Sequence, residues 1–126
     1  MARILVIDDE IQLVEMVQMR LEAAGYDVLT ANDGQVGLEK AKSENPDLIL
    51  CDVMMPKMDG YKVCGLLKND ARYRKIPVIL FTARAQQNDH EVGDEVGADA
   101  YITKPFEPPV LLAKIEELLG KSSQSL

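Results

Sequence analysis

The sequence is poor in the residues that metal-finger and disulfide-stabilised domains require. Its 126 residues include two cysteines and one histidine, His90. Cys51 and Cys64 are far apart and neither belongs to a CxxC pair, so neither a structural zinc site nor a disulfide framework is indicated. Both cysteines stand in apolar runs, and we expect them to be small core residues in a reducing compartment.

Long apolar runs and an excess of basic residues are also lacking. No stretch approaches the roughly 20 apolar residues of a membrane span, and acidic residues interrupt the apolar N-terminus too early for a signal peptide. The 21 acidic and 14 basic residues give a formal net charge of −7, which disfavours contact with nucleic acid phosphates. We therefore expect a cytoplasmic protein with no membrane contact and no direct nucleic acid binding. The basic residues that do cluster, from Lys68 to Lys75, are expected to form a solvated face.

What the sequence does contain is an alternation of short apolar runs and longer segments with helical spacing. The runs predict five strands, at Ile4–Ile7, Val28–Ala31, Leu48–Cys51, Val78–Phe81 and Ala100–Thr103. The helical segments are one from Ile11 to a stop at Gly25, Gly34–Ser43, one carrying Val63, Leu66 and Leu67, Gln86–Val96, and one following Pro108-Pro109.

This alternation predicts a single α/β domain. Crossovers long enough to hold a helix join parallel strands, and such connections are right-handed. The central runs are apolar throughout, as expected for strands covered on both faces. We expect a doubly wound, five-stranded parallel sheet with helices on both faces over residues 1–119. A polar C-terminal tail, residues 120–126, is either the natural end of the chain or the start of a linker.

Polar residues gather where the predicted strands end, a place at which open parallel sheets bind ligands. They are Asp8, Asp9 and Glu10 after the first strand, Asp52 after the third, Thr82 after the fourth and Lys104 after the fifth. Two carboxylates about 4 Å apart repel by roughly 4 kcal/mol at an effective dielectric near 20, so the acids favour a divalent cation such as Mg²⁺. A carboxylate beside that cation can attack phosphorus, while an ammonium and a hydroxyl hold the phosphoryl oxygens.

Four short motifs follow one another in order along residues 3 to 119. They are Ile7-Asp8-Asp9-Glu10, Leu50-Cys51-Asp52-Val53-Met54-Met55-Pro56 with Asp59-Gly60, Thr82-Ala83, and Lys104-Pro105-Phe106. The ordered set resembles the receiver domains of bacterial two-component response regulators. The resemblance implies a flavodoxin-like fold with strand order 2-1-3-4-5. It also implies a phosphorelay function, in which a sensor histidine kinase or a histidine phosphotransfer protein supplies a phosphoryl group.

The resemblance further implies that the domain is a signalling phosphoacceptor rather than an enzyme, although it catalyses its own phosphotransfer and dephosphorylation. Asp52 resembles the phosphorylated aspartate. Asp8, Asp9, Asp52 and the backbone carbonyl of Met54 resemble the ligands of Mg²⁺, for which Mn²⁺ is expected to substitute. Phosphorylation is then expected to switch the binding of a downstream effector protein or of a lost output domain.

The remaining positions are expected to bind the phosphoryl group or to respond to it. Thr82, the backbone N–H of Ala83 and Lys104 resemble the phosphate-binding groups, with a cis peptide bond between Lys104 and Pro105. Thr82 and Tyr101 resemble the switch pair, and Met54 and Arg84 stand where side chains tune the lifetime of the phosphoryl group. Met54 and its neighbours Met55 and Met58 are expected to pack beneath the site.

Other interpretations of these residues stay open at the level of sequence. Asp8 or Asp9 could cap the first helix, Lys104 could form a structural ion pair, and Tyr101 could be a packed edge-strand aromatic. The main alternative function is a receiver-like protein interaction module that is not phosphorylated. Flavin binding is disfavoured because acids stand where a phosphate loop would be needed, and the chain has no P-loop motif.

Overall fold

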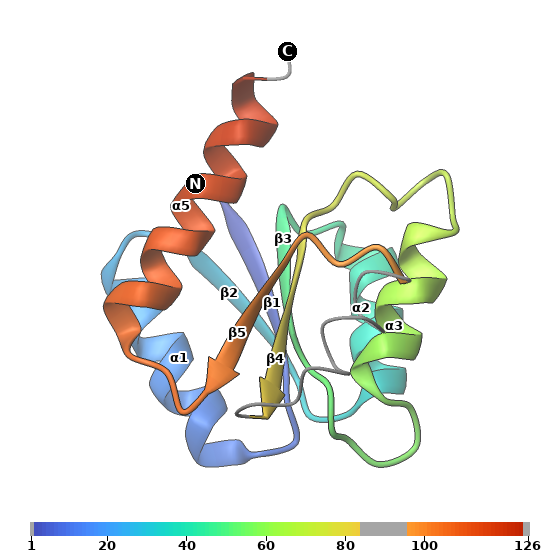
Figure 1. Ribbon diagram of the computed structural model, residues 1–126, viewed down its shortest axis with the longest axis horizontal. Helices are drawn as coiled ribbons and strands as arrows, with labels where there is room; N and C mark the ends of the chain where they lie inside the picture. The colour runs from blue at the N-terminus through green and yellow to red at the C-terminus, as the bar shows by residue number, and fades with distance from the viewer. Residues whose placement is uncertain (1, 84–95, 125–126) are drawn as a thin grey trace.

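The computed structural model describes residues 2–83 and 96–124 (Figure 1). Arg84 and the predicted helix Gln86–Val96, except for Val96 itself, therefore lie outside the described residues. The described strands are β1 (Arg3–Ile7), β2 (Asp27–Ala31), β3 (Leu48–Asp52), β4 (Val78–Ala83) and β5 (Ala100–Lys104). The described helices are α1 (Ile11–Ala23), α2 (Gly34–Glu44), α3 (Gly60–Lys68) and α5 (Pro108–Gln124).

The strands form one parallel sheet in the order β2-β1-β3-β4-β5, which confirms the predicted fold class. The pairing sets Cys51 beside both Ile7 and Leu80, and Asp52 beside Phe81. Farther along, Thr82 pairs with Thr103 and Ala83 with Lys104. The carboxyl ends of β1, β3, β4 and β5 therefore meet at one edge of the sheet.

Helices cover both faces of the sheet (Figure 1). One apolar cluster joins α1 and α5 to the sheet through residues such as Val17, Leu21 and Ile115. A second cluster joins α2 and α3 to the opposite face and contains the two free, buried cysteines, Cys51 and Cys64. The central strands β1, β3 and β4 are buried along nearly their whole length, which explains why their sequences do not alternate.

Helix ends follow from local chemistry. Asp33 caps α2 by accepting from the backbone N–H of Val36 at 2.8 Å, and Asp59 caps α3 by accepting from that of Lys62 at 2.9 Å. Gly25, with φ of 96°, provides the left-handed turn that leads from α1 into β2. Helix α5 includes Pro108, which suits a first turn, and it continues to Gln124, past the boundary expected at residue 119.

The β3–α3 loop is held close to the sheet by two glycines. A Cβ on Gly60 would overlap the carbonyl oxygen of Asp52, and one on Gly34 would overlap that of Met58. The first turns of α3 and α2 can therefore pack directly against the backbone of this loop. None of the described helices is long and apolar enough to cross a membrane.

Candidate functional site

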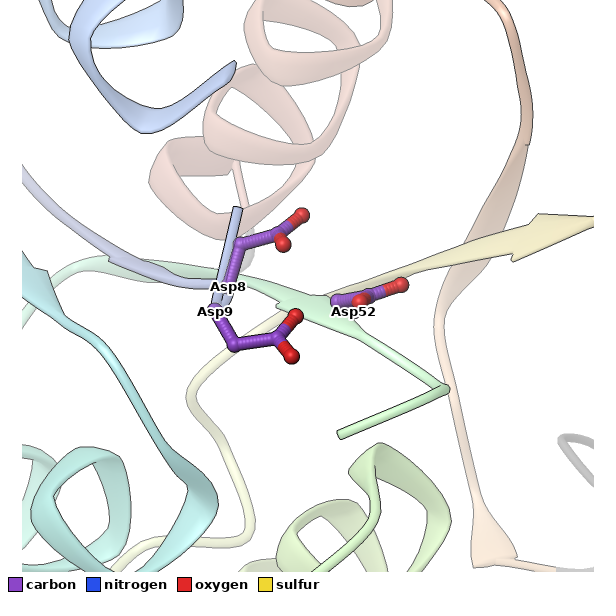
Figure 2. Close-up of side chains that lie close together, drawn as sticks. All are labelled: Asp8, Asp9 and Asp52. Atoms are coloured by element: carbon purple, nitrogen blue, oxygen red, sulfur yellow. The ribbon is translucent and has the colours of Figure 1, made fainter. Parts of the chain in front are cut away.

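Three carboxylates meet at the carboxyl edge of the sheet. Asp8 and Asp9 directly follow β1, and Asp52 is the last residue of β3. Each offers an oxygen that lies within 4.8 Å of the others. Figure 2 shows Asp8 and Asp9 reaching from the end of β1 toward Asp52. The structure thus brings together three acids that are widely separated along the chain.

Asp8 is completely buried and both of its oxygens are engaged. Its Oδ1 accepts from the backbone N–H of Glu10 at 2.9 Å, and its Oδ2 accepts from Lys104 Nζ at 3.0 Å. Glu10, rather than Asp8 or Asp9, occupies the N-cap position of α1, and no side chain caps that helix. The capping interpretation of the acid pair is therefore wrong.

Lys104 links two of the three acids. Its Nζ lies 3.0 Å from Asp8 Oδ2 and 3.2 Å from Asp52 Oδ1. Burial alone would lower the pKa of this ammonium, but the hydrogen bond to Asp8 and the negative charges of Asp52 and Asp8 raise the pKa above its ordinary value. Lys104 therefore stays charged, in a position to hold a further anionic group.

Asp52 is surrounded by opposing influences. Burial and the negative charge of Asp8 raise its pKa to about 6, although Lys104 acts in the opposite direction. Burial and the charge of Asp8 thus disfavour the ionised form of Asp52, and a divalent cation would relieve this repulsion. The three carboxylate oxygens are the hard donors that Mg²⁺ prefers, so the residues present fit this ion.

Thr82 places a buried hydroxyl at the same end of the sheet. The residue is 1% exposed, and its Oγ1 has no hydrogen-bond partner among the described residues. A buried polar atom without a partner is rare and costly. Because the ends of β4 and β5 are paired here, Thr82 lies at the same end of the sheet as Lys104.

The other predicted positions divide into three cases. Tyr101 is partly buried on β5 and packs against the cluster on the α2 and α3 face. Met54 is 75% exposed, so the expectation that it packs beneath the site is wrong, whereas Met55 and Met58 do pack against the core. Arg84 lies outside the described residues, and the Lys104–Pro105 peptide bond is cis as expected.

Sequence reasoning missed an apolar wall beside the acids. A cavity of about 620 Å³ is lined by Asp9, Asp52 and Lys104 and, among its apolar residues, by Leu13, Met16 and Phe106. Leu13 and Met16 lie on α1, where helical spacing alone marks them as ordinary core candidates. No signal in the sequence distinguishes them from residues that face the sheet.

The fold and this site define a doubly wound α/β domain with an acidic, lysine-bearing site suited to phosphoryl chemistry. A sequence profile described as the response regulator receiver domain matches residues 4–116. The chain belongs to this family.

Individual relatives agree with this assignment. The chain is 45% identical over 120 residues to the alkaline phosphatase synthesis transcriptional regulatory protein PhoP of Bacillus subtilis, covering 95% of the chain and 49% of PhoP. Its fold matches a receiver domain protein of Methanospirillum hungatei with a TM-score of 0.94 at 31% identity, covering 100% and 99% of the two chains.

A second solved structure is the receiver domain of the sensor histidine kinase PA1611 from Pseudomonas aeruginosa, described with a magnesium ion coordinated in its active site cleft. It has a TM-score of 0.87 at 28% identity, with coverage of 94% of this chain and 98% of that one. The chain spans about half the length of the first curated relatives it matches.

Proposed function

We propose that Asp52 accepts a phosphoryl group in a Mg²⁺-dependent reaction and that the modified domain changes its affinity for a partner. The observation that carries this proposal is the contact of one ammonium, Lys104 Nζ, with both Asp8 and Asp52 inside a cluster of three acids. The buried hydroxyl of Thr82, which has no hydrogen-bond partner among the described residues, adds a donor at the same end of the sheet that charge balance alone does not explain.

The transfer is a displacement at phosphorus. An oxygen of the Asp52 carboxylate forms a bond to phosphorus as the bond between phosphorus and the donor atom breaks. The donor atom, a histidine nitrogen or the acyl oxygen of a small donor, keeps the electron pair. The product is an acyl phosphate on Asp52, and its hydrolysis returns the carboxylate and inorganic phosphate.

The chain's own residues hold the phosphoryl oxygens. Lys104 keeps one oxygen by charge, while the hydroxyl of Thr82 and the backbone N–H of Ala83 donate to others. Asp8, Asp9, Asp52 and the carbonyl of Met54 would hold Mg²⁺. The PA1611 receiver domain is described with a magnesium ion in its active site cleft. When bound, this ion neutralises the acids and the charge that develops on the phosphoryl oxygens. Mn²⁺, also a hard cation, is expected to substitute.

The partners follow from the family. A sensor histidine kinase or a histidine phosphotransfer protein in the cytoplasm would donate the phosphoryl group. A downstream effector, or an output domain attached to the same chain, would read the result. PhoP is named as a transcriptional regulatory protein, and DNA binding in a longer form of this protein would belong to such an output domain. The acidic receiver domain itself, with a net charge of −7, is not expected to contact DNA.

The proposal is tested by mass analysis of the protein after treatment with acetyl phosphate and Mg²⁺. We expect the mass of one phosphoryl group to be added and to map to Asp52, and Asp52→Asn to abolish the addition. Asp59→Asn is the matched control because Asp59 caps α3 outside the acid cluster. Equal labelling of the Asp52→Asn variant would show that another residue is the acceptor.

A further inference from the structure

Lys104 lies at the end of an outer strand of the sheet, although its ammonium has to be placed accurately. It is the last residue of β5, and β5 lies at the edge of the sheet beside β4. The chain leaves the sheet directly after Lys104, so backbone pairing constrains it from one side. A lysine side chain has high rotamer freedom, and the contacts with Asp8 and Asp52 restrain its ammonium rather than its backbone.

An aromatic stack restrains the backbone on the other side of Lys104. The ring of Phe106 lies parallel to that of Phe81, with a centroid separation of 5.1 Å and an interplanar angle of 4°. Phe81 is fully buried and belongs to β4, where it pairs with Asp52 and directly precedes Thr82. The surrounding core therefore holds the Phe81 ring in place beside the residues of the site.

The same ring also faces the ammonium. Lys104 Nζ lies 5.8 Å from the centre of the Phe81 ring, within the range of a cation–π contact. Phe81 thus contacts Lys104 at its charged end, while Phe106, two residues farther along the chain, holds the backbone. Contacts with Phe81 therefore hold both ends of the segment 104–106 against β4.

We propose that Phe106 is a positioning residue for phosphoryl transfer: by stacking on Phe81 it keeps Lys104 within reach of the phosphoryl oxygens. This inference rests on the proposed function of Asp52. Phe106 carries no charged or metal-ligating group, and its stack on Phe81 holds the segment that follows Lys104, so in this proposal it acts through Lys104. Loss of the stack should therefore impair the transfer and leave the metal site intact.

The first test compares Phe106→Leu with Phe106→Tyr. Phe106→Leu removes the stack and should slow phosphorylation of Asp52 by acetyl phosphate about tenfold, a loss within the range for a displaced positioning group. Its affinity for Mg²⁺, measured by titration without phosphodonor, should stay near the wild-type value. Phe106→Tyr keeps a ring of the same shape and should restore the rate. Leu112→Ala, which disturbs the same apolar cluster away from the stack, should lower stability without slowing the transfer.

The second test is a double-mutant cycle with Lys104→Ala. If Phe106 acts through Lys104, Phe106→Leu should cause no further loss of rate once Lys104 is Ala. Phe106 also lines the cavity beside the acids, so a direct contact with the donor is the competing explanation. Such a contact would weaken saturation by the donor in both backgrounds, and the two losses would then multiply.

The outcomes separate this inference from the proposed function. Three outcomes would each overturn the role of Phe106: losses that multiply in the double-mutant cycle, a Mg²⁺ affinity that falls together with the rate, or a Phe106→Tyr variant as slow as Phe106→Leu. In each of these cases, labelling of Asp52 in the wild-type protein would leave the proposed function standing. A wild-type protein that takes no phosphoryl group would overturn both.

Discussion

Asp9 differs from its two acidic neighbours in how the protein holds it. Asp8 is buried with both oxygens engaged, and Asp52 contacts Lys104, whereas Asp9 is exposed and has no hydrogen bond or ion pair among the described residues. A bound cation would gain a free carboxylate from Asp9 without breaking any contact. Removal of Asp9 should therefore weaken the metal site with little direct effect on the fold.

We predict that Mg²⁺ raises the melting temperature of wild type and has a much smaller effect on Asp9→Ala. The cation relieves repulsion among carboxylates that exists in the folded state, and a ligand at 100 times its dissociation constant adds about 2.7 kcal/mol of stability, roughly 10 °C for a domain of this size. Thermal melts with and without Mg²⁺ measure the difference. Asp27→Ala, which removes an exposed acid at the start of β2, should respond as wild type does. An Asp9→Ala melt with the full response would argue against the metal site.

Met54 should set how long the phosphoryl group survives. Its side chain is 75% exposed and lines the cavity beside Asp52, where a thioether cannot orient an attacking water. Met54→Asn introduces an amide that can do so, and we expect dephosphorylation to become several-fold faster. Decay of the labelled protein gives the rate, with Met19→Asn, an exposed methionine on α1, as the control. An unchanged half-life would remove Met54 from the tuning positions; Arg84 stays a prediction of the same kind.

At the scale of elements, the strands and helices were predictable because their patterns are local. Apolar runs marked the strands and Asp33 marked the start of α2, with boundaries mostly within a residue or two of those found. Lys68 was not predictable. It was expected on a solvated face, yet its side chain is 14% exposed and its Nζ donates to Asp99 Oδ2 at 2.7 Å. Nζ also donates to the carbonyls of Arg74 and Ile76, which are contacts with the backbone that no residue pattern encodes.

Lys68 should be a stabilising junction between α3 and the starts of β4 and β5. Asp99 Oδ2, which binds Lys68, also accepts from the backbone N–H of Val78 at 2.8 Å. Lys68→Met keeps the apolar stem but leaves these acceptors without the ammonium, and we expect a loss of about 2 kcal/mol in the free energy of unfolding. Urea denaturation measures it. Lys62→Met, on the exposed side of α3, is the matched control and should cost little. Equal urea midpoints for Lys68→Met and Lys62→Met would contradict this stabilising role of Lys68.

For the whole molecule, the sheet connects chemistry at one edge with surfaces on both faces. The positions of the acids and Lys104 could be predicted because parallel strands place all their carboxyl ends at the same end of the sheet. The burial of the Thr82 hydroxyl, without a partner in the part of the chain that the structure describes, and the stack of Phe106 on Phe81 could not be predicted. Both depend on how β4 and the segment after β5 pack in three dimensions. We expect a signal from phosphorylated Asp52 to reach a distant surface through these packed strands.

We expect phosphorylation of Asp52 to alter the packing around Tyr101. On β5 it pairs with Leu80 of β4, and together with Val96 it packs against the cluster on the α2 and α3 face. A phosphoryl group adds charge and acceptor oxygens next to Thr82, whose hydroxyl has no other partner among the described residues. If Thr82 shifts toward the group, the space behind it changes and Tyr101 can turn inward. A shift between two existing states of this kind needs a differential stability of only a few kcal/mol.

We therefore predict that the output surface comprises β5, α5 and the segment before β5, including Val96 and Tyr101, with Val92 outside the described residues. Beryllofluoride, which stands in for the phosphoryl group on Asp52, should change chemical shifts and hydrogen exchange at Val96 and Tyr101 as well as in the loops of the site. The Asp52→Asn variant should show no change, because it lacks the carboxylate that the reagent binds. Changes confined to the loops around Asp8, Asp52 and Lys104 would mean that this surface does not carry the signal.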